Sequence, residues 1–279
     1  MITHAQEDYI EHHAYLPEHI PQYVTAISQT EPFLFGNVLA YAKSAHLILV
    51  GYPLGEPFEE KRMERALGDA VKLLKPASVS LIAPSIPSSL ERCPRPPSDH
   101  YYRLDLSSLF ISQKVRNIVK RAGRELSVGK NTNFDEEHRA MVEEFLKTHS
   151  VDEATRFIFQ KIAHYLASSK TAWIFDARTS RGELVAFDIA EFCPRDYAIY
   201  MFNFSSDARY VPGASDLLLF EVIQQAKAER KKYINLGLGI NPGVTFFKEK
   251  WGGVAFLPHA SCLYHPSGKG LLEMILRWL

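Results

Sequence analysis

In the segment 183–192, whose alternating pattern predicts a β-strand, two carboxylates interrupt the apolar run that follows Glu183. Successive side chains of a strand point to opposite faces, so Asp188 and Glu191 are expected on different faces of the sheet. The predicted companions are Leu184, Ala186 and Ala190 for Asp188, and Val185, Phe187 and Ile189 for Glu191. Burial raises the pKa of a carboxylate, so either one could accept the proton of an attacking amine. The sequence shows a partner for neither, and both stay open as the base.

Two amides and a lysine follow further along the chain. Asn203 lies at the end of a predicted strand, in phase with Tyr197, Ile199 and Met201. Asn235 stands just before Gly237 on the next predicted strand. Both are polar groups on apolar strands, which ordinary strand-end hydrogen bonds would also explain. Lys248 falls on a short predicted helix, where its ammonium could stabilise a developing oxyanion or simply favour the end of the helix dipole.

A basic stripe marks the predicted helix 112–124. Arg116, Lys120 and Arg124 recur every fourth residue, while the apolar stripe consists of Val115, Ile118, Val119 and Ala122. Such a stripe could hold the phosphates of a nucleotide-linked substrate, an anionic lipid or a tRNA acceptor stem. A solvated helix face has a similar composition.

The elements that position these residues form two parts. A segment with four prolines and four serines, 85–98, interrupts all periodicity and predicts a division into residues 1–95 and 96–279. The first part is predicted to hold a strand, a helix and a strand, at 45–51, 58–74 and 78–83. The second holds helices at 112–124, 135–148, 152–168 and 215–232, and strands at 101–106, 171–178, 183–192, 197–204, 233–239 and 255–264. The predicted fold is a mixed α/β sheet flanked by helices.

The closing half of the chain carries a resemblance. The helix 215–232, the glycine-containing strand 233–239, the Phe247-Lys248 pair and the Gly252-Gly253 pair follow one another in that order. Together with the basic helix 112–124, this order resembles the GNAT acyltransferase superfamily, and within it the FemABX and phosphatidylglycerol lysyltransferase (DUF2156)-like branch. The resemblance covers about residues 101–264. It implies a tandem of GNAT-like domains of which the N-terminal one is truncated.

The resemblance also implies where a donor would bind. In the resembling fold two strand ends splay apart to admit the acyl donor, so Asn203 and Asn235 would hold its carbonyl and Lys248 would lie near the reacting atoms or a substrate phosphate. The coenzyme A cradle would fall at Arg209, Gly213, Ala214 and Ser215, with Gly237 and Gly239 as further backbone approaches. Pro212 replaces the first glycine of the usual cradle pattern and removes a donor. The donor is therefore open between acyl-coenzyme A and aminoacyl-tRNA.

Composition restricts the remaining classes. Among the 279 residues 46% are hydrophobic, and 32 basic side chains balance 32 acidic ones, which excludes a broad positive field for nucleic acid. The first 30 residues contain no secretory signal, and no apolar run is long enough to span a bilayer, so a cytoplasmic protein is expected. The histidines lack metal-ligand spacing, and no metal is expected. Residues 269–279 predict a short apolar helix that docks on the body or on a second subunit as a homodimer.

These expectations combine into an acyl- or aminoacyltransferase that acts on an amine or hydroxyl of a small-molecule, lipid or peptidoglycan-type acceptor. The alternative is a catalytically degenerate member that keeps the fold as a binding module, because fold alone does not fix function. A cleft plugged by Phe246, Trp251 or Tyr264 would favour that alternative.

Overall fold

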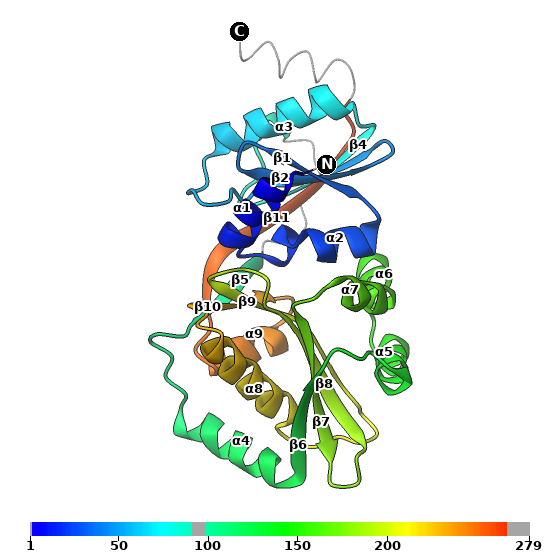
Figure 1. Cartoon of the computed structure of the whole chain (residues 1–279), viewed down its shortest axis with the longest axis vertical. Helices are drawn as coiled ribbons and strands as arrows, with labels where there is room; N and C mark the ends of the chain where they lie inside the picture. Colours follow the sequence, from blue (N-terminus) through cyan, green and yellow to red (C-terminus); the bar gives the residue numbers. More distant parts are fainter. Residues whose placement is uncertain (1, 91–98, 267–279) are drawn as a thin grey trace.

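The structure is a computed structural model of the chain, and it describes residues 2–90 and 99–266. Its strands form one mixed sheet in the order β1-β2-β3-β4-β11-β5-β10-β9-β8-β7-β6 (Figure 1). The predicted α/β class is confirmed. The predicted apolar helix at 269–279 lies outside the described residues.

The first half of the sheet contains β1 (Glu31–Phe35), β2 (Val38–Lys43), β3 (His46–Val50) and β4 (Ser78–Ala83). β3 and β4 are parallel and joined by α3 (Glu60–Leu74), which confirms the predicted strand, helix and strand. Sequence patterns did not predict the hairpin of β1 and β2, nor the segment of α1 (His4–His13), η1 (Pro17–His19) and α2 (Pro21–Ser28) that precedes it.

The second half follows the predicted order closely. Its strands are β5 (Asp99–Asp105), β6 (Leu126–Asn131), β7 (Ala172–Thr179), β8 (Leu184–Glu191), β9 (Tyr197–Ser205), β10 (Tyr233–Leu238) and β11 (Val254–Tyr264). Its helices are α4 (Gln113–Glu125), α5 (Glu136–Thr148), α6 (Glu153–Gln160), α7 (Ile162–Ser168), α8 (Ala214–Ala228) and α9 (Pro242–Lys250). The predicted single helix 152–168 was wrong, because the chain breaks at Lys161 into α6 and α7. Strand β6 was not predicted.

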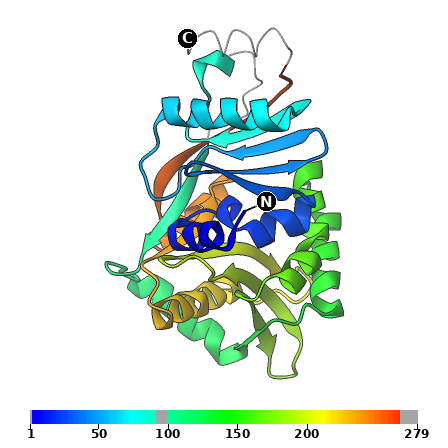
Figure 2. The ribbon, with the colours of Figure 1, turned by 45° about the horizontal axis from the view of Figure 1, so that its top comes forward.

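Strand β11 joins the two halves. Its last residues, from Ala260, pair with β4, and its first residues, from Val254 to His259, pair with β5. The ribbon views show it running through the middle of the molecule between the two groups of strands (Figures 1 and 2). The division near residue 95 falls in the segment outside the described residues and stays a prediction.

Helices cover both faces of the second half. One core lies between the sheet and helices α4 and α8, and another lies between the sheet and helices α5 to α7. The N-terminal segment α1-η1-α2 covers the junction of the two halves, and α2 packs against α7. Each face of the central strands therefore has its own apolar layer.

The parallel pair β9 and β10 is short. Pairing runs from Tyr233 and Tyr197 to Asn235 and Ile199, and it stops there although both strands continue. A bulge in β10 follows, at Gly237, whose φ of +76° is easily adopted only by glycine. The two strands separate beyond this point, and we call this separation the split.

Candidate active site

Asp188 lies on β8 directly opposite Asn203 of β9. Two bulges change the faces expected from strict alternation. A register shift at Val185 places that residue with Asp188 on the α8 face and turns Leu184 to the other face. A second shift at Met201 places Asn203 on the face of Tyr200 instead of that of Met201. The predictions for Leu184, Val185 and Met201 were wrong because a bulge adds one residue to the two-residue period, whereas Ala186 and Ala190 share the face of Asp188 as predicted.

The carboxyl group of Asp188 is fully buried and only half satisfied. Its Oδ1 accepts a hydrogen bond of 2.6 Å from Nδ2 of Asn203, whereas Oδ2 has no partner among the described residues. Burial raises the pKa of Asp188 to about 8, and the bond from Asn203 offsets only part of that effect. The hydroxyl of Tyr200 lies beside this carboxyl group and also offsets part of the rise in its pKa. A group of this kind exchanges a proton near neutral pH.

Glu191 is buried on the same strand but is fully used by the fold. Its Oε2 accepts from the hydroxyls of Tyr165 and Ser169, both at 2.8 Å. Its Oε1 accepts from the backbone N–H groups of Phe192 and Cys193, at 2.9 and 3.0 Å. Four donors satisfy this carboxylate, so it closes the end of β8. Of the two candidate bases, Asp188 keeps a free oxygen.

A chain of polar contacts leads from Asp188 to the start of α8. Asn203 Oδ1 accepts from the Ser215 hydroxyl at 3.2 Å, while its Nδ2 holds Asp188. Asn203 thus has both ends of its amide engaged and fixes the orientation of the carboxyl group.

Asn235 has a different role from that of Asn203. Its Nδ2 donates to the carbonyl of Tyr15 at 2.7 Å, and its Oδ1 accepts from the N–H of Gly237 at 2.7 Å. The residue is fully buried. It therefore attaches the N-terminal segment to β10 where the split begins, and the structure gives its amide no free end for a substrate carbonyl.

Lys248 is buried under β10, with 4% of its surface exposed. Its ammonium donates to the carbonyl of Leu238, and a Cβ on Gly237 would stand 3.7 Å from Nζ. Burial lowers the pKa of Lys248 to about 8, partly offset by the charge of Asp99. A solvent-exposed cation that only stabilises the end of the helix dipole would not be buried to this extent.

The predicted cradle at the start of α8 is only partly present. Gly213 is the N-cap with φ +88°, and the Ser215 hydroxyl bonds Asn203. A Cβ on Gly213 would lie 2.7 Å from Cγ2 of Ile118, so the glycine permits the close approach of α4.

The pocket beside this helix start is small and carries an acid. It has a volume of about 120 Å³, and its walls include Ser215, Asp216 and Phe247. The Asp216 Oδ1 accepts from Trp251 Nε1 at 2.9 Å and pairs with Lys250 at 2.7 Å. Because Lys250 compensates the charge of Asp216, the pair brings no net positive charge that would attract a pyrophosphate. No sequence pattern indicated these contacts of Asp216.

The other cradle residues point elsewhere. Arg209 Nε donates to the carbonyl of Leu184 at 3.1 Å. The N–H of Gly239 donates to Asp99 Oδ1 at 3.0 Å, in the connection between β10 and α9. The structure thus brings Ala214 and Ser215 to the pocket wall with Gly213, but places Gly237 and Gly239 on the β10 side of the split.

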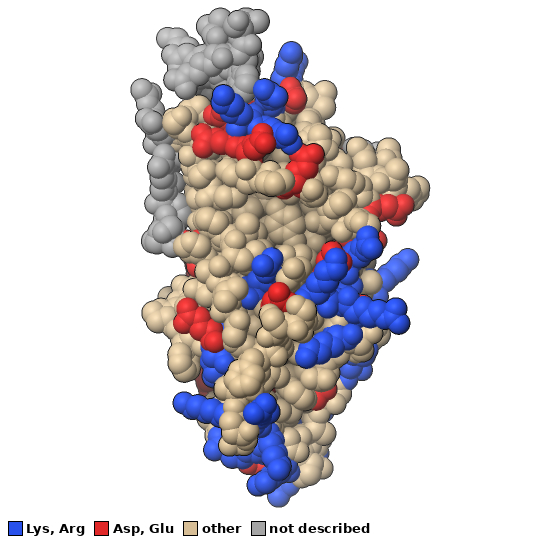
Figure 3. Space-filling view, turned by 90° about the vertical axis from the view of Figure 1, so that its left-hand side faces the viewer, with Lys and Arg blue, Asp and Glu red and all other residues tan. Residues whose placement is uncertain are grey.

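The basic stripe of α4 is exposed. Arg116, Lys120 and Arg124 have no carboxylate partner among the described residues, and Arg116 contacts only Gln113 within the helix. Lys and Arg side chains gather at the lower end of the molecule, the end where α4 lies in Figure 1 (Figure 3). Ile118 on the apolar side of α4 touches Gly213, so α4 packs against the start of α8 while the bases lie on its exposed side.

None of the three aromatic residues named as potential plugs fills the split. Phe246 is 62% exposed, and Tyr264 pairs with Val79 of β4 in the first half of the sheet. Trp251 is buried in the core below α8, with its indole N–H on Asp216.

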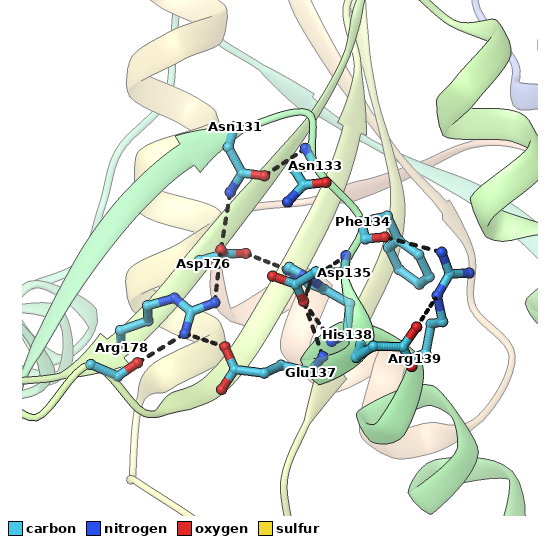
Figure 4. A network of polar contacts seen from close by, with 11 residues as sticks. Asn131, Asn133, Phe134, Asp135, Glu137, His138, Arg139, Asp176 and Arg178 are labelled. Atoms are coloured by element: carbon cyan, nitrogen blue, oxygen red, sulfur yellow. Dashed lines mark hydrogen bonds and ion pairs between the residues drawn. The ribbon is translucent and has the colours of Figure 1, made fainter.

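A second polar network, on the α5 side of the sheet, is satisfied internally (Figure 4). The imidazole of His138 contacts Asp135 through Nδ1 at 2.7 Å and Asp176 through Nε2 at 2.9 Å. Asp176 also accepts from Asn131 at 3.0 Å and pairs with Arg178 at 3.5 Å. Burial lowers the pKa of His138, but the two carboxylates outweigh it and raise the pKa overall. The network attaches α5 to the sheet edge, and the Asp135-x-x-His138 capping box was its one sequence signal.

Comparison with solved structures identifies the architecture. The C-terminal DUF2156 domain of a putative lysylphosphatidylglycerol synthetase from Agrobacterium fabrum superposes with a TM-score of 0.62 at 13% identity, over 98% of this chain and 96% of that one. FemX gives 0.63 at 11% identity, over 99% and 98%. A tandem GNAT protein from the clavulanic acid biosynthesis pathway gives 0.54 at 10% identity, over 94% of each chain. The chain has a GNAT-like fold. The tandem arrangement expected from the sequence agrees with these full-length superpositions.

The sequence matches no protein-family model and no curated protein. Within residues 2–90 and 99–266, no cluster of three potential metal ligands occurs. No helix in the same ranges is long and apolar enough to cross a membrane.

Proposed function

We propose that this protein transfers an acyl or aminoacyl group to an amine or hydroxyl acceptor at the split between β9 and β10, with Asp188 as the proton acceptor. The main support for this proposal is the carboxyl group of Asp188, which has only one of its oxygens hydrogen-bonded and is held by Asn203 on the strand that borders the split. Glu191, with four donors, supports the choice by contrast. Buried titratable groups with a free atom are concentrated at functional sites.

In the proposed reaction the acceptor nitrogen or oxygen attacks the carbonyl carbon of the donor ester or thioester. The new C–N or C–O bond forms, the donor C–O or C–S bond breaks, and the acceptor proton passes to Oδ2 of Asp188. That proton then protonates the leaving oxygen or sulfur, which regenerates the carboxylate. Asn203 orients Asp188, and Lys248 supplies positive charge for the oxyanion or for an anionic part of the substrate.

An aminoacyl ester is favoured over coenzyme A as the donor. Asp216 lies in the pocket at the start of α8, and Pro212 removes one N–H from the loop before it. The lost N–H weakens binding of a pyrophosphate, and Asp216 with its ion-pair partner Lys250 adds no net positive charge to attract one. Helix α4 packs against the start of α8, and its exposed bases suit a phosphate backbone, which supports aminoacyl-tRNA as the donor class. The structures similar to this one include a putative lysylphosphatidylglycerol synthetase domain and FemX, which supports a lipid or cell-wall acceptor.

A donor comparison tests the proposal. Purified protein is incubated with a mixed pool of radiolabelled aminoacyl-tRNAs or with labelled acetyl-coenzyme A, and with lipid and cell-wall precursor extracts as acceptors. The proposal expects label to move from aminoacyl-tRNA to an extract component, and much more slowly from acetyl-coenzyme A. Arg116→Ala combined with Lys120→Ala should raise the KM for aminoacyl-tRNA and make binding less salt-dependent. Absence of transfer from both donors would favour a binding module instead.

A further inference from the structure

A hollow of about 480 Å³ lies at the end of α8, at the opposite end of the helix from the pocket beside Ser215. Three segments form its walls: residues 105–107 at the end of β5, Lys227 in the last turn of α8, and residues 231–233, where β10 begins. The split follows Asn235 on that strand, so the hollow is separate from the proposed reaction site. Its volume is within the range of about 300–1,000 Å³ that is usual for small-ligand sites.

Lysines supply the positive charge of this hollow. Lys227 is exposed and has no partner among the described residues. Lys232 forms an exposed ion pair of 2.9 Å with Asp196, a kind of contact that stabilises little and leaves the ammonium available to another anion. Lys231 is committed to the fold, because its ammonium donates to two backbone carbonyls at 2.6 and 2.8 Å. Lys227 and Lys232 are therefore the two lysines that can bind a ligand directly.

Arg103 adds a further positive charge next to the hollow. Its guanidinium lies 4.3 Å from the centroid of the Tyr233 ring and donates to the Tyr197 hydroxyl at 3.1 Å. It forms no ion pair with a described residue, and its buried Nε has no hydrogen-bond partner among them. The rings of Tyr197 and Tyr233 are 5.0 Å apart. Tyr233, the aromatic wall of the hollow, is thus held in place beside an uncompensated cation.

The hollow and the basic helix α4 are on the same side of the molecule. In Figure 3 Lys and Arg side chains gather at mid-height as well as at the lower end, and β10 lies at mid-height on that side in Figure 1. Gly213, which touches α4, and Lys227 stand at the two ends of α8, about 20 Å apart. An RNA molecule is long enough to contact both groups of bases.

A carboxylate in the hollow narrows the choice of ligand. Asp105 Oδ1 accepts from the hydroxyl and the N–H of Ser107 at 2.6 and 2.9 Å, and these bonds lower the pKa of Asp105, so it is ionised at neutral pH. An ionised carboxylate repels a bare phosphate but accepts hydrogen bonds from hydroxyl and amino groups. A ligand that carries a phosphate together with such donors satisfies the lysines and Asp105 at once.

A nucleotide has this combination of groups. Its phosphate can contact Lys227 and Lys232 while a ribose hydroxyl or a base amino group donates to Asp105. Stabilisation of the helix dipole would explain lysines at the end of α8, but it explains neither the hollow nor the presence of Asp105 and Tyr233 in its wall.

We propose that the hollow at the end of α8 binds a ribonucleotide through Lys227, Lys232 and Asp105. The inference rests on the proposed function, because it gives the aminoacyl-tRNA donor a second contact besides α4. The same chemistry fits a free nucleotide, and the test separates the two sources. The site lies outside the split, so its residues position a substrate and take no part in the proton transfer.

Binding of three probes to the purified protein tests the proposal: deacylated tRNA, cytidine 5′-monophosphate and inorganic phosphate. Lys227→Gln combined with Lys232→Gln removes two charges from the hollow, and Lys61→Gln combined with Lys72→Gln, on α3, is the charge-matched control. The hollow variant should bind tRNA about tenfold more weakly than the wild type and the control. Its slope of log K against log salt should become shallower by roughly 1.4–1.8, since each phosphate contact contributes about 0.7–0.9. Urea unfolding establishes that both variants are folded.

The wild type should also bind cytidine 5′-monophosphate more tightly than inorganic phosphate. Weaker binding of this nucleotide by the hollow variant, with unchanged tRNA binding, would assign the hollow to a free nucleotide. Equal effects of the two double substitutions on both ligands would overturn the site, and so would binding of the nucleotide no tighter than that of phosphate. Asp188→Asn should bind tRNA like the wild type, so loss of transfer with retained tRNA binding would count against the proposed reaction alone.

Discussion

Replacing Asp188 by Asn should stabilise the protein at alkaline pH. In the folded state the pKa of Asp188 is raised from 3.8 to about 8, so the folded protein binds more protons than the unfolded one between these values. Stability from this group is complete below the unfolded pKa and is lost as pH rises toward 8. Each pKa unit corresponds to about 1.36 kcal/mol, which gives a loss of about 4 kcal/mol between pH 5 and pH 9. Asn has nearly the same shape, keeps an acceptor for Asn203 and does not ionise.

Urea unfolding of the wild type and Asp188→Asn at pH 5, 7 and 9 measures this effect. The free energy of unfolding of Asp188→Asn minus that of the wild type should increase by about 4 kcal/mol from pH 5 to pH 9. Other titrating groups are common to both proteins and cancel. Glu191→Gln is the matched control on the same strand. It should destabilise at every pH, by about 1–3 kcal/mol, because an amide cannot accept from all four donors. A difference for Asp188→Asn that does not change with pH would refute the reasoning.

Three further predictions concern other parts of the molecule. Gly213→Ala should lower the free energy of unfolding in urea by about 1–3 kcal/mol, because φ at this position is +88° and the added Cβ would meet Ile118 at 2.7 Å. Gly129→Ala is the control and should be nearly neutral, since its Cβ would meet nothing within 4 Å. Equal effects of the two substitutions would contradict this prediction. His138→Gln should destabilise by about 2–4 kcal/mol at pH 6. Because the pKa of His138 is raised, this contribution is complete below about pH 6.5 and is lost as pH rises, so a gap to wild type that widens toward pH 9 would argue against it. Lys248→Met should lower the transfer rate by about 10²-fold with the KM for the acceptor unchanged if the ammonium stabilises the oxyanion, and unchanged kcat would exclude that role.

Hydrophobic periodicity predicted most of the second half of the fold, since its helices have strong caps and stripes. Ser112, Asp135 and Asp152 each accept a hydrogen bond from the first turn of the helix they begin. The hairpin of β1 and β2 escaped prediction because its strands are short and Pro32 interrupts the first.

Within the site, the sequence named Asp188 and Asn203 but not their mutual contact or the presence of Tyr200 beside them. The bulges at Val185 and Met201 decide which side chains share a face of the sheet with Asp188 and Asn203. A bulge depends on how two strands pair, and the pattern of one strand alone does not show it. The choice between Asp188 and Glu191 likewise required their partners in space. The place of Asp216 in the pocket at α8 depends on its contacts with Trp251 and Lys250, which lie 34 or more positions away in the sequence. The sequence pattern around Asp216 does not contain these contacts.

The central claim is that Asp188 accepts the acceptor proton during transfer. It is tested most directly by the pH dependence of the single-turnover rate with saturating labelled aminoacyl-tRNA donor and the acceptor identified in the extracts. The account predicts that the wild-type rate rises about tenfold per pH unit below the pKa of Asp188 and levels off above about pH 8. Asp188→Asn should be slower by about 10²–10⁴-fold and should lack this rise. A variant that transfers at the wild-type rate with the same pH profile would contradict the claim.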